Sequence, residues 1–442
     1  MRLRGSLVIT AGAILALAVW PTVIALRSQA PAAIVAPVPV NTDYLQRDKV
    51  ISFEERIVRR DPQDQITSRM LALQYLQRFR EQGDVGDIER AQAMAERSIR
   101  LQPQGNTAGQ MGLASALLDY HKFRAAIGHE QDAIDGEPFN QNAIAQKASL
   151  LMELGHYRDA GRILARTPPG PENPTWESIQ ARYDELTGRM NEARALIARA
   201  ERRVDQNYYE PAYDRSWYHM RGAQLAFETG DNAAAEKEFA TSLALFPNNY
   251  MALLWEARYY RSRKEWQKSL DAATKGANLY PLPQLLGYKA DAQRGLGDTK
   301  GAAQTDALIR AEQRLFNVQG INDRLLANYY AQRRIYLGDA VRFAKLDYRQ
   351  RGDEIYSDDT MGWVLATTGK WAEARTYAER AVRFNTQDAD VQYHAGIVAM
   401  HTGHAAEAKR RLEYALKLNP QFDPFDAADA RAQLAKRSMA SR

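Results

Sequence analysis

The sequence predicts an all-α fold, an α-solenoid of about ten helix-turn-helix repeats of 34 residues, preceded by one N-terminal hydrophobic helix. Three observations predict this fold. Small residues recur along the chain with a step close to 34, most of them have a small partner twelve positions earlier, and an uncharged run occupies residues 7–26. A fixed period of this length is typical of helical repeat arrays.

The recurrent small residue is expected to open the second helix of each unit. Its steps along the chain are 33 to 35 residues, apart from one step of 42 and one of 38. The series comprises Ala91, Ala126, Ala160, Ala193, Ala235, Ser269, Ala302, Ala340, Ala374 and Ala408. The ten units are therefore expected to begin near residues 72, 107, 141, 174, 216, 250, 283, 321, 355 and 389.

The first helix of most units carries its own small residue on the inner face. These residues are Ala114, Ala148, Ala181, Ala223, Ala257, Ala290, Gly362 and Gly396. Small residues at both places let the two helices of a unit approach closely, because a bulky side chain at either place would hold them apart. One unit cannot bury its apolar face alone, so neighbouring units must stack.

Two strings carry a resemblance to a known family. Gly-His-Tyr-Arg-Asp-Ala at 155–160 and Ala-Leu-Lys-Leu-Asn-Pro at 415–420 resemble the tetratricopeptide repeat family, and the resemblance covers about residues 70–422. It implies a right-handed superhelix that binds other proteins. The resemblance is weakest in the first unit, at the insertion near 205–214, and in the unit at 321, where Asn328 replaces the small residue.

Residues 1–27 are expected to direct export. Arg2 and Arg4 precede the uncharged run at 7–26, whose 20 residues span about 30 Å as a helix. This charge distribution places the N-terminus in the cytoplasm and the repeats outside it. The segment is either an uncleaved anchor in the inner membrane or a cleaved signal peptide, which would leave a periplasmic or secreted protein.

The other boundaries complete the expected organisation. A Pro- and Ala-rich linker is expected at 28–43, an N-terminal cap at 44–71, the repeats at 72–422, and a capping helix with its tail at 423–442. The array leaves no room for a separate catalytic domain. We therefore expect no enzyme, no cofactor and no small-molecule substrate.

Composition narrows the function classes further. The chain has no cysteine, which excludes disulfides, thiol nucleophiles and thiolate metal sites. The net charge of +5 falls short of a nucleic-acid-binding face. His394, His401 and His404 lack a metal-ligand motif, and the glycine-rich stretch 295–301 lacks the order of a phosphate loop, so neither a metal nor a nucleotide is expected.

The predicted concave face combines arginine with aromatic side chains over several adjacent units. The candidate partner-binding residues are Arg221, Arg258, Arg261, Arg294, Tyr329, Arg333 and Trp363. Such a surface suits extended or helical protein segments, acidic ones included, through paired hydrogen bonds and stacking. Ordinary solvated charge on a helix face is an equally good interpretation.

The region of the insertion is aromatic, with Tyr208, Tyr209, Tyr213, Trp217 and Tyr218. Inserted loops often carry binding functions. The favoured interpretation is that these rings fill the widened junction between two units, because aromatic side chains more often fill space than bind a partner.

These observations favour a scaffold for protein–protein interaction in a cell-envelope assembly, exported or tethered to the membrane through residues 7–26. The alternative is a groove that binds an anionic polymer such as a polysaccharide. Binding of such a polymer would weaken steeply with salt, whereas a protein partner would be retained by buried apolar contacts.

Overall fold

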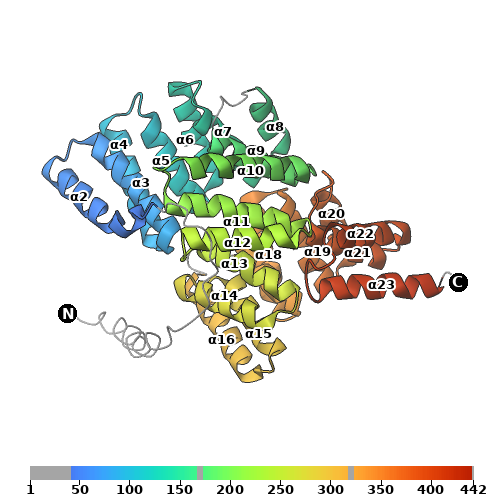
Figure 1. Cartoon of the computed structure of the whole chain (residues 1–442). Coiled ribbons are helices and arrows are strands. Elements are labelled where there is room, and N and C mark those ends of the chain that lie inside the picture. The colour runs from blue at the N-terminus through green and yellow to red at the C-terminus, as the bar shows by residue number, and fades with distance from the viewer. Residues whose placement is uncertain (1–40, 167–172, 317–322, 441–442) are drawn as a thin grey trace, which may run out of the picture. The chain divides into compact units, whose positions relative to one another are not determined.

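The computed structural model describes residues 41–166, 173–316 and 323–440. These residues form 22 α-helices and one short 3-10 helix (Figure 1). The hydrophobic segment 7–26 and most of the linker 28–43 lie outside the described residues. Within the described ranges, no helix has both the length and the apolar character that crossing a membrane requires.

The helices pack in ten consecutive pairs, which confirms the predicted all-α solenoid architecture. The first helices of the pairs are α3 (Gln65–Gln82), α5 (Thr107–Asp119), α7 (Gln141–Glu153), α9 (Pro174–Leu186), α11 (Ala212–Glu228), α13 (Tyr250–Ser262), α15 (Pro283–Gly295), α17 (Asp323–Arg333), α19 (Ile355–Thr367) and α21 (Ala389–His401). The second helices are α4 (Val85–Leu101), α6 (Phe123–Gly136), α8 (Tyr157–Arg166), α10 (Met190–Gln206), α12 (Asn232–Leu245), α14 (Trp266–Leu279), α16 (Thr299–Phe316), α18 (Leu337–Arg351), α20 (Trp371–Ala381) and α22 (Ala405–Leu418).

Three further elements flank the pairs. The 3-10 turn η2 (Asp43–Gln46) and helix α2 (Arg47–Arg60) precede the first pair, and α23 (Asp426–Ala440) follows the tenth. Helix α3 begins at Gln65, seven residues before the expected start at 72. The side chain of Asp64 accepts a hydrogen bond from the backbone N–H of Thr67 at 2.8 Å and so fixes this earlier start.

Asparagine side chains set the start of several first helices. Asn140, Asn173 and Asn249 each accept a hydrogen bond from the backbone N–H three residues later, at 3.1, 3.0 and 3.0 Å. The first N–H groups of a helix have no partner inside it, so these side chains satisfy one of them. The repeat period is therefore marked at helix starts as well as at helix crossings.

The turn inside each pair uses at least one residue in the left-handed region. Gly155 holds this position in the third pair with a φ of 75°. His121, Lys264 and Arg334 hold it in three other pairs with φ values of 57°, 61° and 53°. These pairs form the same turn without glycine, at the cost of backbone strain in a side-chain-bearing residue.

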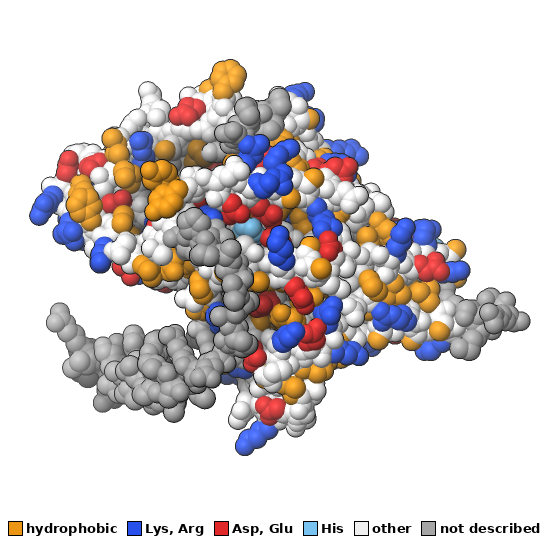
Figure 2. Space-filling model, viewed as in Figure 1, with side chains coloured by type: hydrophobic (Ala, Val, Ile, Leu, Met, Phe, Trp, Pro, Cys, Tyr) orange, Lys and Arg blue, Asp and Glu red, His pale blue; other side chains and the backbone are white. Residues whose placement is uncertain are grey.

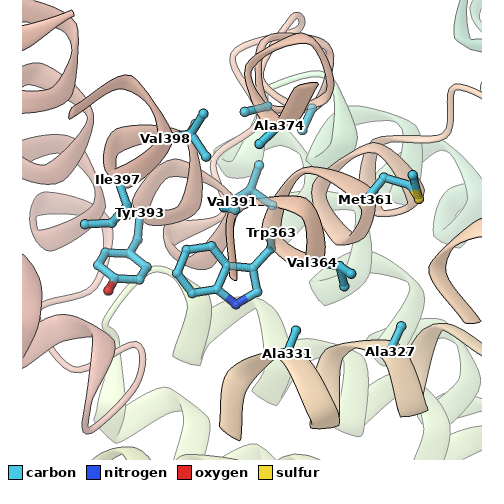
Figure 3. Packing of buried hydrophobic residues seen from close by; sticks show 14 of the residues in the cluster. Ala327, Ala331, Met361, Trp363, Val364, Ala374, Val391, Tyr393, Ile397 and Val398 are labelled. Carbon is cyan, nitrogen blue, oxygen red and sulfur yellow. The ribbon is translucent and has the colours of Figure 1, made fainter. Parts of the chain in front are cut away.

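The small residues lie at close helix crossings, as their spacing predicted. All ten members of the second-helix series are at most 1% exposed. A Cβ atom added at Gly362 would lie 3.2 Å from the backbone nitrogen of Ala378. The eighth pair differs, because Tyr330 of α17 packs against Phe343 of α18 with ring centroids 6.5 Å apart. Figure 3 shows Ala327 and Ala331 of α17 on the side that faces Val364 of α19.

Successive turns of the superhelix contact each other. The backbone N–H of Ile355 donates to the Tyr157 hydroxyl at 3.0 Å, across 198 residues. The Asn419 amide donates to the carbonyl of Phe227 at 2.7 Å, across 192 residues. The first contact joins the third pair to the ninth, and the second joins the fifth pair to the segment before α23. One superhelical turn therefore takes six pairs, and the next pair lies directly against the first.

Candidate functional site: the inner pocket of the superhelix

A pocket of about 350 Å³ lies where seven consecutive first helices face one another. Helices α9, α11, α13, α15, α17, α19 and α21 all contribute to its wall, together with the start of α23. Its lining includes five arginines, six carboxylates, one histidine and five Trp or Tyr side chains. The volume lies in the range of ligand pockets and accommodates a few side chains of a peptide rather than a folded domain.

The structure brings five of the seven predicted groove residues to this pocket. They are Arg258, Arg261, Tyr329, Arg333 and Trp363. The two others lie outside its lining. Arg221 forms an ion pair with Glu185 at 2.6 Å, and Arg294 forms one with Asp306.

The pocket arginines are not free cations, because Arg258, Arg261 and Arg333 already form ion pairs within the chain. Arg261 is only 2% exposed, and its Nε donates to Asp291 at 2.7 Å while its Nη1 reaches Asp423. Arg258 forms an ion pair with Asp390. Asp291 lies on the adjacent first helix, whereas Asp390 and Asp423 are 132 and 162 residues from their arginines and are brought against them by the closing of the superhelix. The pocket is thus a surface of mixed charge.

Each of these guanidinium groups also lies over an aromatic ring. Arg258 lies 5.0 Å from the centroid of the Trp255 ring, and Arg261 lies 5.4 Å from that of Tyr288. Such contacts add about 0.5–2 kcal/mol each to the ion pairs. The predicted combination of arginine with aromatic rings is therefore present, but its arginines are already engaged within the chain.

Part of the acidic wall comes from the C-terminal segment. Asp423 bonds to Arg261, and Asp426 lines the pocket as well. Asp426 begins the helix that the sequence predicts as a C-terminal cap, and it lies in the wall of the inner pocket. Burial, reinforced by the neighbouring Asp423, raises the pKa of Asp426 to about 8. The start of α23 thus completes the inner wall.

His394 belongs to the pocket and not to a histidine cluster. Its Nδ1 lies 3.0 Å from Asp359, and its ring stacks on Trp363 with centroids 4.1 Å apart. Figure 3 shows the Trp363 ring held between Tyr393 of α21 and helix α17. Burial lowers the pKa of His394, but the adjacent Asp359 outweighs it and raises the pKa to about 9. His394 therefore adds a cation to the pocket at neutral pH.

The other sequence candidates lie elsewhere. His401 stacks on Trp371 with ring centroids 3.8 Å apart, and His404 contacts Thr402 at 3.1 Å. The glycine-rich stretch 295–301 forms the turn between α15 and α16, with Gly297 in the left-handed region.

The aromatic residues of the insertion divide into two groups. Tyr213 and Tyr218 are 6% and 7% exposed, so they fill the widened junction as the favoured interpretation predicted. Tyr208 and Tyr209 are 68% and 84% exposed and pack against each other with ring centroids 5.6 Å apart. These two rings are available to a partner on the outer surface.

The N-terminal helices carry a second exposed apolar region. Figure 2 shows hydrophobic side chains gathered over the part of the surface that α2, α3 and α4 occupy in Figure 1. Phe53 of α2 is 56% exposed, and Ile66, Met70 and Leu73 of α3 are each about half exposed. The last three lie at helical spacing and so form one stripe along α3.

The fold and pocket together define an α-solenoid with a polar inner pocket. Residues 220–281, which span the second half of α11 and the whole of α12, α13 and α14, match the family model described as tetratricopeptide repeat. Within these residues the chain is similar to tetratricopeptide repeats. Tetratricopeptide repeat domains bind protein or peptide partners and are typically non-catalytic.

No curated protein matches the sequence. Three solved structures illustrate what the chain resembles. Yeast Tom70 is 12% identical, with 83% of this chain and 96% of that chain covered and a TM-score of 0.33. The Naa15/Naa10 complex bound to HypK-THB is 14% identical, with coverages of 90% and 66% and a TM-score of 0.29. Pseudomonas aeruginosa pilF is 15% identical, with coverages of 55% and 99% and a TM-score of 0.36.

Proposed function

We propose that this chain is an exported or membrane-tethered scaffold of a cell-envelope assembly, and that its inner pocket binds a short segment of a partner protein. The observation that carries the proposal is the pocket itself, to which seven first helices contribute. A segment bound there contacts many repeats at once. Its binding therefore depends on the intact superhelical turn.

The exposed groups of the pocket indicate the chemistry of the partner segment. Trp255, Tyr288 and Tyr356 are partly exposed in its wall, and Gln332 is exposed. Aromatic side chains in a concave site are the usual anchors of a protein interface. The arginines already have carboxylate partners, so the segment should bring apolar or aromatic side chains together with polar groups, and a strongly acidic segment has no special advantage.

The proposed location rests on the N-terminal sequence. Arg2 and Arg4 precede the uncharged run 7–26, and a Pro-rich stretch follows it. This order of charge and apolar length is that of an export signal or anchor. The absence of cysteine from the whole sequence is compatible with an oxidising compartment.

An anionic polymer remains the alternative ligand. The pocket arginines Arg258, Arg261 and Arg333 already form ion pairs within the chain, which disfavours a polyanion, because its charges would have to compete with these carboxylates. The two ligand classes differ in their response to salt. Binding of a polyanion should fall steeply with ionic strength, whereas binding through aromatic anchors should persist.

The pocket is tested by crosslinking in membranes, followed by capture of the full-length protein. The variant Trp255→Ala/Tyr288→Ala should lose its crosslinked partner, with affinity reduced at least about tenfold. The matched control is Phe139→Ala/Tyr336→Ala, which removes two exposed rings outside the pocket lining. Equal capture by both variants, at unchanged melting temperature, would rule out the pocket as the binding site.

The location is tested by a reporter that is active only outside the cytoplasm, fused after Arg442. Activity is the expected result, and a signal from a cytoplasm-only reporter in the same position would refute export. Retention in the membrane pellet after an alkaline wash then separates an anchor from a cleaved signal.

A further inference from the structure

A cluster of metal-ligating side chains lies outside the inner pocket, at the junction that the insertion widens. Glu201 of α10, His219 of α11 and Glu238 of α12 each place one ligand atom within 4.8 Å of the other two. The three helices are consecutive, and they belong to the two units whose repeat spacing is 42 residues instead of 34. The ligands share no short sequence motif, which explains why sequence spacing does not reveal them.

The two nitrogens of His219 face different carboxylates. Its Nδ1 lies 2.6 Å from Oε2 of Glu238, and its Nε2 lies 3.1 Å from Oδ2 of Asp205. His219 is only 7% exposed, so its ring orientation is fixed by these contacts and by packing. A histidine that binds a metal through one nitrogen almost always donates its other N–H to a carboxylate or carbonyl. Asp205 is placed to accept that hydrogen bond.

Glu201 supplies an independent observation. Its Oε1 is shielded from solvent and has no hydrogen-bond partner among the described residues. Buried carboxylate oxygens normally accept a hydrogen bond or bind a cation, and neither is present for this oxygen among the described residues. Burial, reinforced by the nearby Glu238, raises the pKa of Glu201 to about 8. A cation at this place would satisfy the oxygen and offset the charge repulsion.

The chain also leaves space for the Glu201 carboxylate. A Cβ atom added at Gly222 would lie 2.1 Å from Oε1 of Glu201. Gly222 follows His219 by three positions on α11, so it lies beside the histidine on the helix surface. A larger residue at 222 would therefore require the Glu201 side chain to move.

The geometry points to a divalent metal site in which Glu201, Nδ1 of His219 and Glu238 bind a Zn²⁺-type cation and Asp205 orients the imidazole. One nitrogen and two carboxylate ligands suit Zn²⁺ or Co²⁺ better than Mg²⁺ or Ca²⁺, which prefer all-oxygen sites. Ligand atoms around a tetrahedral Zn²⁺ are about 3.3 Å apart, which small side-chain movements achieve here. Three protein ligands leave the fourth position to water.

Such a site would clamp three successive helices across the widened junction. This role goes beyond partner binding in the inner pocket and does not depend on it. The ion would hold α10, α11 and α12 together where the repeat spacing is irregular, next to the exposed Tyr208 and Tyr209. It would therefore stabilise the part of the array that presents these two rings.

The experiment uses the full chain, purified without a histidine tag and stripped of metal with a chelator. Zn²⁺, Co²⁺, Mg²⁺ and Ca²⁺ are added separately, and bound metal is measured by mass spectrometry after dialysis. We expect one Zn²⁺ or Co²⁺ per chain and a higher melting temperature with Zn²⁺. The visible absorption of bound Co²⁺ should be that of a four-coordinate ion. Failure of both Zn²⁺ and Co²⁺ to bind at this stoichiometry would refute the site.

Three substitutions identify the ligands. Glu201→Gln keeps the shape of the side chain, so the variant should fold, and it should lose at least about 100-fold in Zn²⁺ affinity. Asp205→Asn should weaken binding about 10- to 100-fold by releasing the imidazole. The matched control is Glu130→Gln, which alters another buried carboxyl with raised pKa, on α6, and should bind like the wild type. Wild-type affinity in Glu201→Gln would overturn the proposal.

Discussion

The Thr386 hydroxyl donates a hydrogen bond to the backbone carbonyl of Leu186 at 3.0 Å, although 200 residues separate the two. The contact is buried and joins the end of the fourth first helix to the segment that precedes the tenth. Close by, a Cβ atom at Gly188 would lie 2.7 Å from the carbonyl oxygen of Asn385. Backbone therefore packs on backbone where one superhelical turn meets the next.

Gly155 provides a test of this contact. Its φ is 75°, and an added Cβ would lie 2.6 Å from the carbonyl carbon and oxygen of Asp353 in the next turn. Gly369 holds the corresponding turn of the ninth pair with a φ of 80° and has no heavy atom within 4 Å of an added Cβ. Both Ala variants incur about 1–2 kcal/mol of backbone strain.

We expect Gly155→Ala to lower the free energy of unfolding by about 1–3 kcal/mol more than Gly369→Ala, because only the former forces the turns apart. Denaturant titrations followed by circular dichroism measure the difference. Equal losses in the two variants would show that successive turns do not touch in solution.

Arg261 should be a stability residue as well as a pocket residue. Arg261→Leu leaves Asp423 buried without its guanidinium partner, whereas Asp291 keeps Arg333 at 2.6 Å. Loss of one member of a buried ion pair costs about 3–5 kcal/mol, because an uncompensated charge remains. The loss should appear as a lower denaturation midpoint.

The matched control for this prediction is Arg100→Leu. Arg100 is 68% exposed at its side chain and pairs only loosely with Glu96, at 3.8 Å, so its removal should change stability by no more than about 0.5 kcal/mol. Adding Asp423→Asn to Arg261→Leu should recover part of the loss, because it neutralises the stranded charge. A double variant no more stable than Arg261→Leu alone would contradict this account.

His394 makes the stability depend on pH. Its folded-state pKa of about 9 lies above the ordinary value of 6.5. The stability that it contributes is therefore fully present below pH 6.5 and is lost as the pH rises through 9. Three carboxylates face the imidazolium: Asp359 of α19, Asp390 of α21 and Asp426 of α23. When His394 loses its proton, all three lose their favourable interaction with its positive charge.

The predicted measurement compares the wild type with His394→Gln at several pH values. Between pH 6.5 and 9 the wild type should lose on the order of 3 kcal/mol relative to the variant. His404→Gln, in the exposed turn before α22, should follow the wild type. Parallel pH profiles for the wild type and His394→Gln would refute the assigned role of the Asp359 pair.

Local sequence accounts for most of the fold. Ala374 and Ala408 mark their helix pairs because a close crossing tolerates only a small side chain, and that requirement repeats with every unit. Asn140 and Asn249 mark helix starts because N–H groups there need an acceptor. Both requirements act within one unit or between neighbours, so they are visible as a period of 34. The start of the first pair is at Gln65 instead of 72 because α3 has 18 residues, whereas α5, α7 and α9 have 13 each.

The inner pocket was decided by the tertiary structure. The sequence indicated that Arg258 and Arg261 lie on first helices, but their partners Asp390 and Asp423 are more than 130 residues away. Which carboxylates meet them depends on the rotation and rise from each pair to the next, summed over a full turn. A small change in that rotation or rise, repeated at every pair, would move the tenth pair away from α13 and so separate Asp390 from Arg258. The sequence by itself therefore determined the repeating unit, whereas the closure of the superhelix after six pairs, and with it the ion-paired pocket, depends on how the pairs stack.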